Sequence, residues 1–163
     1  MNFCITGLPR SRTAWFAAYF TASGHLCAHE GMRGCNTVSE YYKKMEDYEG
    51  DSNCGAMLIP CEKTVIIERN PADVKKSLYR LFDNQKEIDE TIDFFHEKLK
   101  QKDGLRIRFS EIDENLKLIH EYCAGDTYKE NVAEMMKKLN ITTNDYAVDE
   151  KSINLLGELL CLS

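Results

Sequence analysis

Residues 5–15 read ITGLPRSRTAW; they follow the apolar residues 3–5 and lead into the segment WFAAYF. This order predicts a strand over about residues 2–6, a tight loop, and a helix over about residues 13–22. We expect Gly7 to let the backbone turn sharply and Pro9 to stiffen the loop before the helix. Such a loop points several N–H groups and the positive end of the helix dipole at one spot. The stretch therefore predicts an anion-binding site.

The spacing within this loop argues against magnesium-dependent ATP chemistry. A nucleoside-triphosphate loop has the form GxxxxGK followed by Ser or Thr, in which the lysine contacts phosphates and the hydroxyl holds magnesium. Counting from Gly7, Thr13 stands in the lysine position and Ala14 in the hydroxyl position. The loop keeps an early cation, Arg10, so we expect it to hold a phosphate group without a metal ion.

The composition is that of one ordinary globular domain. Of the 163 residues, 43% are hydrophobic and 29% are charged, so we predict a single domain over residues 1–163. The net charge of −6 does not favour nonspecific attraction to nucleic acid or membranes, although a cationic pocket would be a local exception. No apolar run reaches the ~18 residues that span a bilayer, and the N-terminus enters a strand rather than a signal peptide. A cytoplasmic protein without a nucleic-acid or membrane partner is expected.

Seven cysteines are spread along the chain without the paired spacing of a zinc knuckle. In a reducing compartment we expect them to be free thiols. One group of possible zinc ligands comprises His25, Cys27, His29 and Cys35, of which residues 25, 27 and 29 would share a strand face. Structural zinc sites usually take paired ligands from two knuckles, so core thiols and a pocket histidine are favoured and no metal site is predicted.

The rest of the chain alternates between short apolar and longer amphipathic segments. Further strands are expected over about residues 25–29, 64–67 and 105–109, and further helices over about residues 37–48, 88–99, 112–124, 128–139 and 149–162. Residues 50–55 are interpreted as a polar break, and residues 56–59 are apolar but too few to assign. The alternation predicts an α/β fold of three layers, with a central parallel sheet of about four to five strands, helices on both faces, and a ligand at the carboxyl ends of the strands.

A second informative stretch, ERNPADVKKSLYRLF, occupies residues 68–82. It follows the apolar segment 64–67, which predicts a buried parallel strand. Asn70 is a favoured N-cap, and Pro71 suits the first helical position. The predicted apolar stripe of the helix consists of Val74, Leu78 and Leu81.

Three segments resemble the sulfotransferases that use 3′-phosphoadenosine 5′-phosphosulfate (PAPS). The first loop is similar to their 5′-phosphosulfate loop, whose usual form is close to PKSGTTW. Arg10, Ser11, Thr13 and Trp15 match this form or substitute conservatively, whereas Arg12 replaces a Gly and Ala14 a Thr. The segment VIIERNPADVKKSLYRL resembles the family's 3′-phosphate segment, commonly RNPxDVxxSxY, and RIRFSEIDENLKLIHEYCAG resembles its later strand, acidic turn and helix. The resemblance covers about residues 2–125, and the family's C-terminal RKGxxGxWK segment has no counterpart.

This resemblance implies a P-loop-type fold and transfer of a sulfuryl group from PAPS to a hydroxyl or amine of a small-molecule acceptor, with PAP as product and no metal required. The residues that would bind PAPS are Gly7, Leu8, Pro9, Arg10, Ser11, Arg12, Thr13, Ala14, Arg69 and Ser77. Arg10 would also act in catalysis by stabilising the departing phosphate. Branches of the family use a Glu just past the second strand as the base, so Glu30 and His29 are the first candidates, and Asp51 is the third.

Other interpretations stay open. An ATP-dependent small-molecule or nucleotide kinase would share the fold, with Glu68 ending an apolar strand as a Walker-B acid does. A non-catalytic protein that binds PAP or another nucleotide would fit the missing C-terminal segment. Tyr41, Tyr42 and Tyr48 could line an acceptor pocket or simply pack. The helices after residue 128 could cover the site or form the surface of a homodimer.

Overall fold

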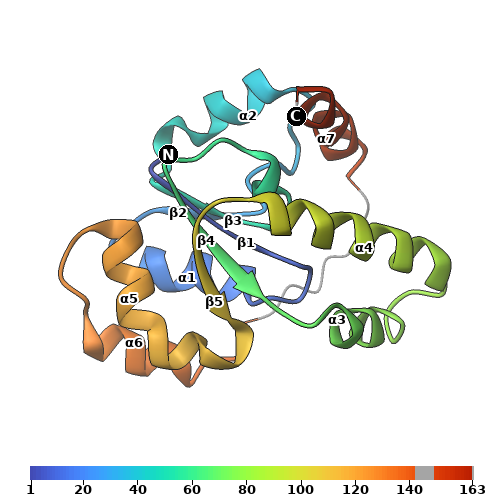
Figure 1. Cartoon of the computed structure of the whole chain (residues 1–163). Coiled ribbons are helices and arrows are strands. Elements are labelled where there is room, and N and C mark those ends of the chain that lie inside the picture. Colours follow the sequence, from blue (N-terminus) through green and yellow to red (C-terminus); the bar gives the residue numbers. More distant parts are fainter. Residues whose placement is uncertain (142–148, 163) are drawn as a thin grey trace.

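The computed structural model describes residues 1–141 and 149–162, and its central element is a sheet of five parallel strands. The strands lie in the order β2-β3-β1-β4-β5 (Figure 1). Their bounds are Phe3–Gly7 for β1, Cys27–His29 for β2, Gly50–Ser52 for β3, Lys63–Glu68 for β4 and Leu105–Arg108 for β5. The predicted parallel α/β sheet of four to five strands is confirmed, with β1 in its middle.

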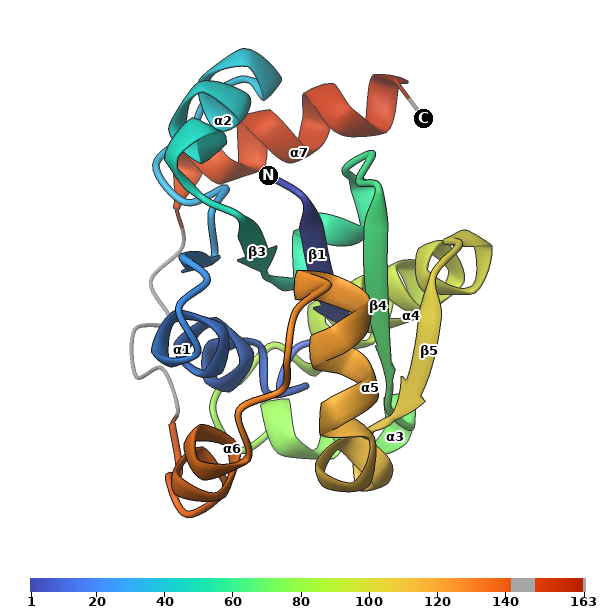
Figure 2. The ribbon, with the colours of Figure 1, turned by 90° about the vertical axis from the view of Figure 1, so that its left-hand side faces the viewer.

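Seven α-helices in the described part of the chain flank this sheet. They are α1 (Thr13–Ala22), α2 (Val38–Lys44), α3 (Pro71–Leu78), α4 (Gln85–Gln101), α5 (Ile112–Ala124), α6 (Glu130–Lys137) and α7 (Glu150–Leu162). Three short 3-10 helices are η1 (Met45–Asp47), η2 (Cys54–Leu58) and η3 (Phe109–Glu111). Figure 2 shows α1, α5 and α6 on one face of the sheet and α3 and α4 on the other. Helices therefore cover both faces, as predicted.

The strand β4 is buried between two apolar clusters. Val65 and Ile67 face the cluster that contains residues of α1, α5 and α6, whereas Ile66 faces the cluster that contains residues of α3 and α4. Successive side chains of a strand point to opposite faces, so a strand covered on both sides is a continuous apolar run in the sequence. The prediction of a buried parallel strand at this position is confirmed. A third cluster joins α2 and α7 near Met1.

The N-cap predicted for α3 is confirmed. α1 and α5 have the predicted bounds. The side chain of Asn70 caps α3 by accepting a hydrogen bond from the Ala72 N–H at 2.9 Å. The Thr37 hydroxyl accepts one from the Glu40 N–H at 3.2 Å and caps α2. Both contacts join residues within one turn of each other, so the signal for such a cap is local in the sequence.

Two expected helices end early. α3 ends at Leu78, so Leu81 lies beyond it and is 43% exposed, which corrects the predicted apolar stripe. The chain turns there, because the Leu81 N–H bonds the Leu78 carbonyl oxygen at 2.8 Å. α2 ends at Lys44 and continues as η1, before the predicted end at residue 48. Met45 of η1 is buried, so the apolar spacing of α2 continues past its end.

The predicted polar break over residues 50–55 is wrong, because Gly50–Ser52 forms β3 between β2 and β1. Gly50 fits this position because a Cβ there would come within 2.2 Å of the Phe3 ring. Asp51 is fully buried and satisfied by hydrogen bonds. A strand that buries a hydrogen-bonded carboxylate leaves no apolar pattern in the sequence. The unassigned residues 56–59 fall mostly within η2.

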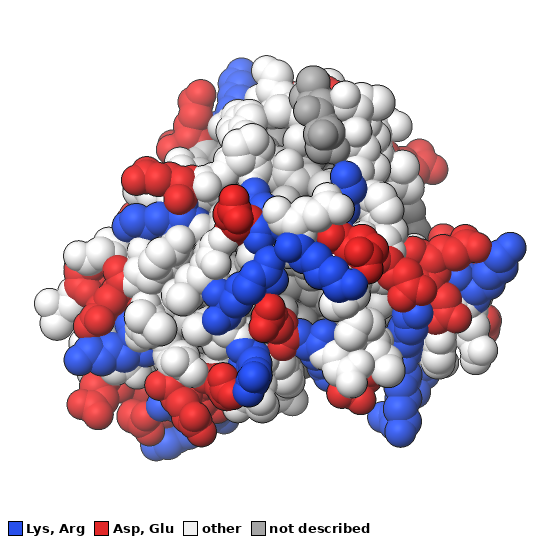
Figure 3. All heavy atoms as spheres, viewed as in Figure 1, with Lys and Arg blue, Asp and Glu red and all other residues white. Residues whose placement is uncertain are grey.

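Charges of both signs are mixed on the face drawn in Figure 3, with acidic side chains gathered over α4 on its right. Several Asp and Glu residues of α4 form ion pairs with lysines of the same helix or of α3. Within the residues described, every helix is too short or too polar to pass through a bilayer.

Candidate functional site

A cavity of about 1180 Å³ opens at the carboxyl ends of the strands. Every strand contributes a residue at or just beyond its end: Arg10 after β1, His29 of β2, Cys54 after β3, Arg69 after β4 and Phe109 after β5. β1 and β4 lie side by side in the sheet. The chain continues from β1 to β2 on one side of this pair and from β4 to β5 on the other side. Such a switch point opens a crevice where parallel α/β sheets bind ligands. The cavity therefore lies where the strand order predicts a ligand.

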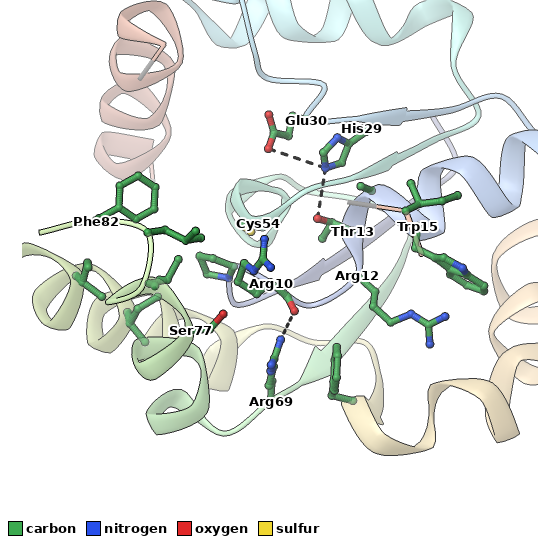
Figure 4. A pocket seen from close by; sticks show the side chains of 18 of the residues that line it. Arg10, Arg12, Thr13, Trp15, His29, Glu30, Cys54, Arg69, Ser77 and Phe82 are labelled. Atoms are coloured by element: carbon green, nitrogen blue, oxygen red, sulfur yellow. Dashed lines mark hydrogen bonds and ion pairs between the residues drawn. The ribbon is translucent and has the colours of Figure 1, made fainter. Parts of the chain in front are cut away.

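Arg69 joins the two stretches singled out in the sequence. Its guanidinium donates a hydrogen bond to the backbone carbonyl oxygen of Arg10 (Figure 4) and lies over the Phe109 ring, 4.3 Å from its centroid. Burial lowers the pKa of Arg69; Asp73 raises it, and the Arg10 guanidinium lowers it further. An anion between the two cations would relieve their repulsion.

The amino end of α1 borders this cavity and carries no negative charge of its own. Its N-cap, Arg12, makes no side-chain capping hydrogen bond, and its first turn contains no acidic residue. Every other α-helix of the described residues has Asp or Glu in its first turn. Thr13 and Ala14 of α1 line the cavity. The N–H groups and the positive dipole end of α1 are thus available to an anion.

Three residues other than glycine have a left-handed backbone, and all three line the cavity. Within the described ranges these are Arg10 at φ 69°, Arg12 at φ 62° and Glu30 at φ 54°. An L-residue in this conformation costs about 1 kcal/mol or more. Such strain is found at binding and catalytic sites, where the surrounding structure holds it in place. It occurs here in the loops after β1 and β2.

Gly7 is required for close packing rather than for a turn. A Cβ on Gly7 would lie 2.8 Å from the Ile67 carbonyl oxygen in β4 and 3.1 Å from the Cβ of Ser11. The positive φ angles that turn the loop belong to Arg10 and Arg12. The expectation that Gly7 supplies the sharp turn is therefore corrected: its missing side chain lets the loop pack against β4.

The cavity is positively charged in a negatively charged protein. The described lining residues include six Lys and Arg side chains and three Asp and Glu side chains, whereas the whole chain carries a net charge of −6. The cations are Arg10, Arg12, Arg33, Arg69, Lys137 and Lys138, and the acids are Glu30, Asp83 and Glu87. A concave surface with an excess of one sign concentrates ligands of the opposite sign. The cavity therefore favours anions.

The imidazole of His29, the last residue of β2, lies near two polar side chains. Its Nε2 lies 3.5 Å from the Thr13 hydroxyl and 3.9 Å from a Glu30 carboxylate oxygen (Figure 4). Burial lowers the pKa of His29 below its ordinary 6.5, an effect that Glu30 opposes and Arg33 reinforces. The imidazole is therefore neutral near pH 7 and can accept a proton. Glu30 forms an ion pair with Arg33 at 3.4 Å.

Asp51, the third candidate base, lies outside this cavity. Its carboxylate accepts hydrogen bonds from the Gly31 N–H and the Tyr41 hydroxyl, both at 3.0 Å, and from the Asn53 amide. Burial raises its pKa, and these three donors offset the effect only in part. Asp51 therefore connects the loops after β2 and β3 instead of reaching a ligand. Tyr41 is buried with it, which favours packing over a role in the acceptor pocket.

Nine predicted site residues line the cavity: Pro9, Arg10, Arg12, Thr13, Ala14, His29, Glu30, Arg69 and Ser77. Figure 4 shows His29 and Glu30 at one end, Arg69 and Ser77 at the other, and Arg10 between them. Gly7, Leu8 and Ser11 are buried and do not belong to the described lining. The Ser11 hydroxyl is buried without a hydrogen-bond partner among the described residues.

Lys137 and Lys138 line the cavity without having been predicted. They follow from the packing of α6 on α1, because the Trp15 indole N–H donates a hydrogen bond to the Met136 carbonyl oxygen at 3.0 Å. Nothing in the local sequence indicates this contact, which joins residues 121 positions apart. Arg33 also lines the cavity and was not predicted to do so. Its position shortly after the end of β2 could have indicated this role. The helices after residue 128 were expected to cover the site or to form a dimer surface. One of them, α6, borders the cavity.

The cysteines do not supply a nucleophile to the cavity. All seven are free thiols. Cys54 lines the cavity, and burial raises its pKa to about 12, so the thiol stays protonated. The set His25, Cys27, His29 and Cys35 does not converge into a group of metal ligands in the part of the chain that the structure describes.

Comparison with protein-family models and with curated proteins finds no match. What the cavity can bind therefore follows from its geometry and charge. It offers a helix N-terminus, two adjoining arginines and a serine hydroxyl to anionic groups, and a neutral imidazole at one end. This arrangement can hold phosphate groups and accept a proton from a neighbouring molecule.

Proposed function

We propose that the protein is a PAPS-dependent sulfotransferase acting on a hydroxyl or amine of a small-molecule acceptor. The observation that carries the proposal is the hydrogen bond from Arg69 to the Arg10 carbonyl, because it joins over one cavity the two stretches that resemble PAPS-binding segments. Arg10 and the N-terminus of α1 provide one cationic centre, and Arg69 with Ser77 provides another. A nucleoside carrying two separate phosphate groups matches these two centres, and PAPS and PAP are such nucleosides.

The proposed roles follow from the positions of the side chains. The acceptor atom attacks the sulfur of PAPS, its proton passes to Nε2 of His29, and the bond from sulfur to the phosphate oxygen breaks. Arg10 and the N–H groups of α1 stabilise the charge that develops on the departing phosphate. His29 is preferred to Glu30 as the base because its lowered pKa keeps it neutral and because Glu30 pairs with Arg33.

A magnesium-dependent kinase is supported less well. Glu68 pairs with Arg106 at 3.1 Å and does not belong to the described lining of the cavity. The loop also lacks the lysine and the hydroxyl residue that hold phosphates and magnesium. A non-catalytic nucleotide-binding protein would need the same cationic centres but no base, so the neutral His29 favours an enzyme.

Thermal unfolding with PAP, and with ATP, each with and without magnesium, tests the ligand. At about a hundred times its Kd, a ligand stabilises a protein by about 2.7 kcal/mol. For a chain of this size that corresponds to an increase in Tm of roughly 5–10 °C. We expect PAP to produce this increase without magnesium. An effect of ATP that requires magnesium, with none from PAP, would instead identify a kinase.

Transfer is tested separately, with PAPS carrying radiolabelled sulfate and a panel of phenols, alcohols and amines. Labelled product with at least one acceptor, lost in His29→Gln and retained in His96→Gln, is the expected result. PAP binding without transfer to any acceptor would favour the non-catalytic protein. The absence of any stabilisation by PAP would overturn the proposal.

A further inference from the structure

A second group of polar side chains lies at the amino ends of the strands, opposite the cavity. His25 precedes β2, Glu49 precedes β3, and His120 and Asp126 lie at the carboxyl end of α5. Nε2 of His25 is 3.2 Å from Oδ2 of Asp126, and Nε2 of His120 is 2.8 Å from Oδ1. One ligand atom from each of His25, His120 and Asp126 lies within 4.8 Å of the ligand atoms of the other two.

We propose that His25, His120 and Asp126 bind one divalent transition-metal ion, with Zn²⁺ as the preferred ion. Bonds of about 2.0–2.1 Å to a tetrahedral zinc place neighbouring ligand atoms roughly 3.3 Å apart. Nε2 of His25 is close to this distance from Oδ2 of Asp126, and Nε2 of His120 is somewhat closer to Oδ1. Two imidazoles and one carboxylate are a ligand set that zinc accepts, with a fourth position for water.

Both imidazoles are held in the orientation that a metal ligand requires. Nδ1 of His25 lies 2.9 Å from a Glu49 carboxylate oxygen, and Nδ1 of His120 lies 3.0 Å from the Tyr19 hydroxyl. Histidine ligands commonly donate their second N–H to a carboxylate or another acceptor, which fixes the ring and raises its basicity. Each Nε2 is thereby directed at Asp126.

Two carboxylates flank His25. Its Nδ1 faces Glu49 and its Nε2 faces Asp126. With a metal ion bound to Nε2 and Asp126, Nδ1–H would donate to Glu49 and hold the ring in place. The charges of Glu49 and Asp126 also match a divalent ion.

The group is buried on the side of His120. His120 is fully buried, its ring is stacked on Phe20 with centroids 5.7 Å apart, and Tyr128 lies edge-on to it. Gly125, at φ 72°, ends α5 and turns the chain so that Asp126 comes back toward His120. The Asp126 side chain is 45% exposed, which leaves a path for the ion and a water ligand. Zinc there would tie the start of β2 to the end of α5.

This group is distinct from the zinc ligands considered in the sequence, with which it shares only His25. It also includes no residue that lines the cavity. The ion would therefore stabilise the fold and would take no part in the proposed transfer. Metal binding and PAP binding can be measured independently, so either proposal can fail without the other.

Calorimetric titration of the chelator-treated full chain with Zn²⁺ tests the site. We expect one ion per chain, with affinity lowered at least about tenfold in Asp126→Asn and His25→Gln. Glu49→Gln should lower it by about tenfold through the orientation of His25. His96→Gln on α4 is the matched control and should bind as the wild type does. His120 is left unchanged because it is buried, and circular dichroism checks that each variant folds.

Cobalt distinguishes this site from adventitious binding to the free cysteines. Co²⁺ bound by imidazole and carboxylate gives only weak visible bands, whereas cysteine ligands add a strong near-ultraviolet charge-transfer band. Weak bands that disappear in Asp126→Asn, together with a Tm that zinc raises in the wild type but not in that variant, would support the site. No saturable binding, an affinity unchanged by Asp126→Asn, or a thiolate band would overturn it.

Discussion

The guanidinium of Arg69 donates a hydrogen bond to the backbone carbonyl oxygen of Arg10, 59 residues earlier in the chain. The contact is possible because β1 and β4 are parallel neighbours, with Gly7 opposite Ile67 at their carboxyl ends. Gly7 lets the first loop approach β4 closely, and Arg69 follows that strand directly. The register of the sheet thus sets the separation of the two cationic centres.

Arg69→Ala should weaken PAP binding about ten- to a hundredfold, since a hydrogen bond to a charged group contributes about 1.5–3 kcal/mol. Isothermal titration measures the change. Arg80→Ala is the matched control, because Arg80 is an exposed arginine just beyond α3 that does not belong to the described lining. Equal affinities of the two variants would remove Arg69 from the ligand site.

Arg10→Ala and Arg10→Gly should both slow transfer about a hundredfold, because losing one preorganised group costs about 3 kcal/mol in the transition state. Comparing the two variants distinguishes the effect of the lost guanidinium charge from the effect of backbone strain at residue 10. Both lack the guanidinium, but only glycine adopts the left-handed backbone at residue 10 without cost. Similar rate losses would assign the effect to charge. A residual rate in Arg10→Gly within a factor of two of wild type would contradict a catalytic role.

The value of kcat/KM should rise with pH to a plateau through a pKa below 6.5, because burial lowers the pKa of His29. His29→Gln should abolish this dependence, and His96→Gln should preserve it. If the dependence survives in His29→Gln and vanishes in Glu30→Gln, then Glu30 is the base. The same shift affects stability: the unfolded chain binds the proton more readily, so the contribution of His29 is complete above pH 6.5 and declines as the pH falls below it.

Glu30→Gly should raise Tm by roughly 2–4 °C, since relief of the left-handed backbone is worth about 1 kcal/mol in a chain of this size. The lost ion pair with Arg33 is partly exposed and contributes little. Glu30→Ala, which keeps the strain, is the control and should not raise Tm. A Tm of Glu30→Gly at or below that of Glu30→Ala would argue against strain at this position.

Asp51→Ala should lower the free energy of unfolding by at least about 2 kcal/mol, because it leaves three buried donors without an acceptor. Urea denaturation measures the loss, and Asp47→Ala, at an exposed position, should change stability by less than about 0.5 kcal/mol. Transfer by the folded fraction of Asp51→Ala should remain unchanged. A loss of transfer in fully folded Asp51→Ala protein would restore Asp51 as a candidate base.

Short-range features of the protein could be predicted from the sequence. The N-cap Asn70, the bounds of α1 and α5, and the buried strand β4 each depend on residues a few positions apart. Apolar and capping patterns act over one turn or one strand, so their signal is local. The position of the cavity at the carboxyl ends of the strands also follows from the alternation of strands and helices.

The tertiary structure decided the rest. β3 could not be predicted, because Asp51 is stabilised in the interior by donors from Gly31 and Tyr41, which lie elsewhere in the sequence. Lys137 and Lys138 reach the cavity only because α6 packs on Trp15. His25, His120 and Asp126 are separated by up to 101 residues and meet where β2 begins and α5 ends. A local sequence pattern carries no information about such partners, because only the packing of helices against the sheet determines which distant side chains meet.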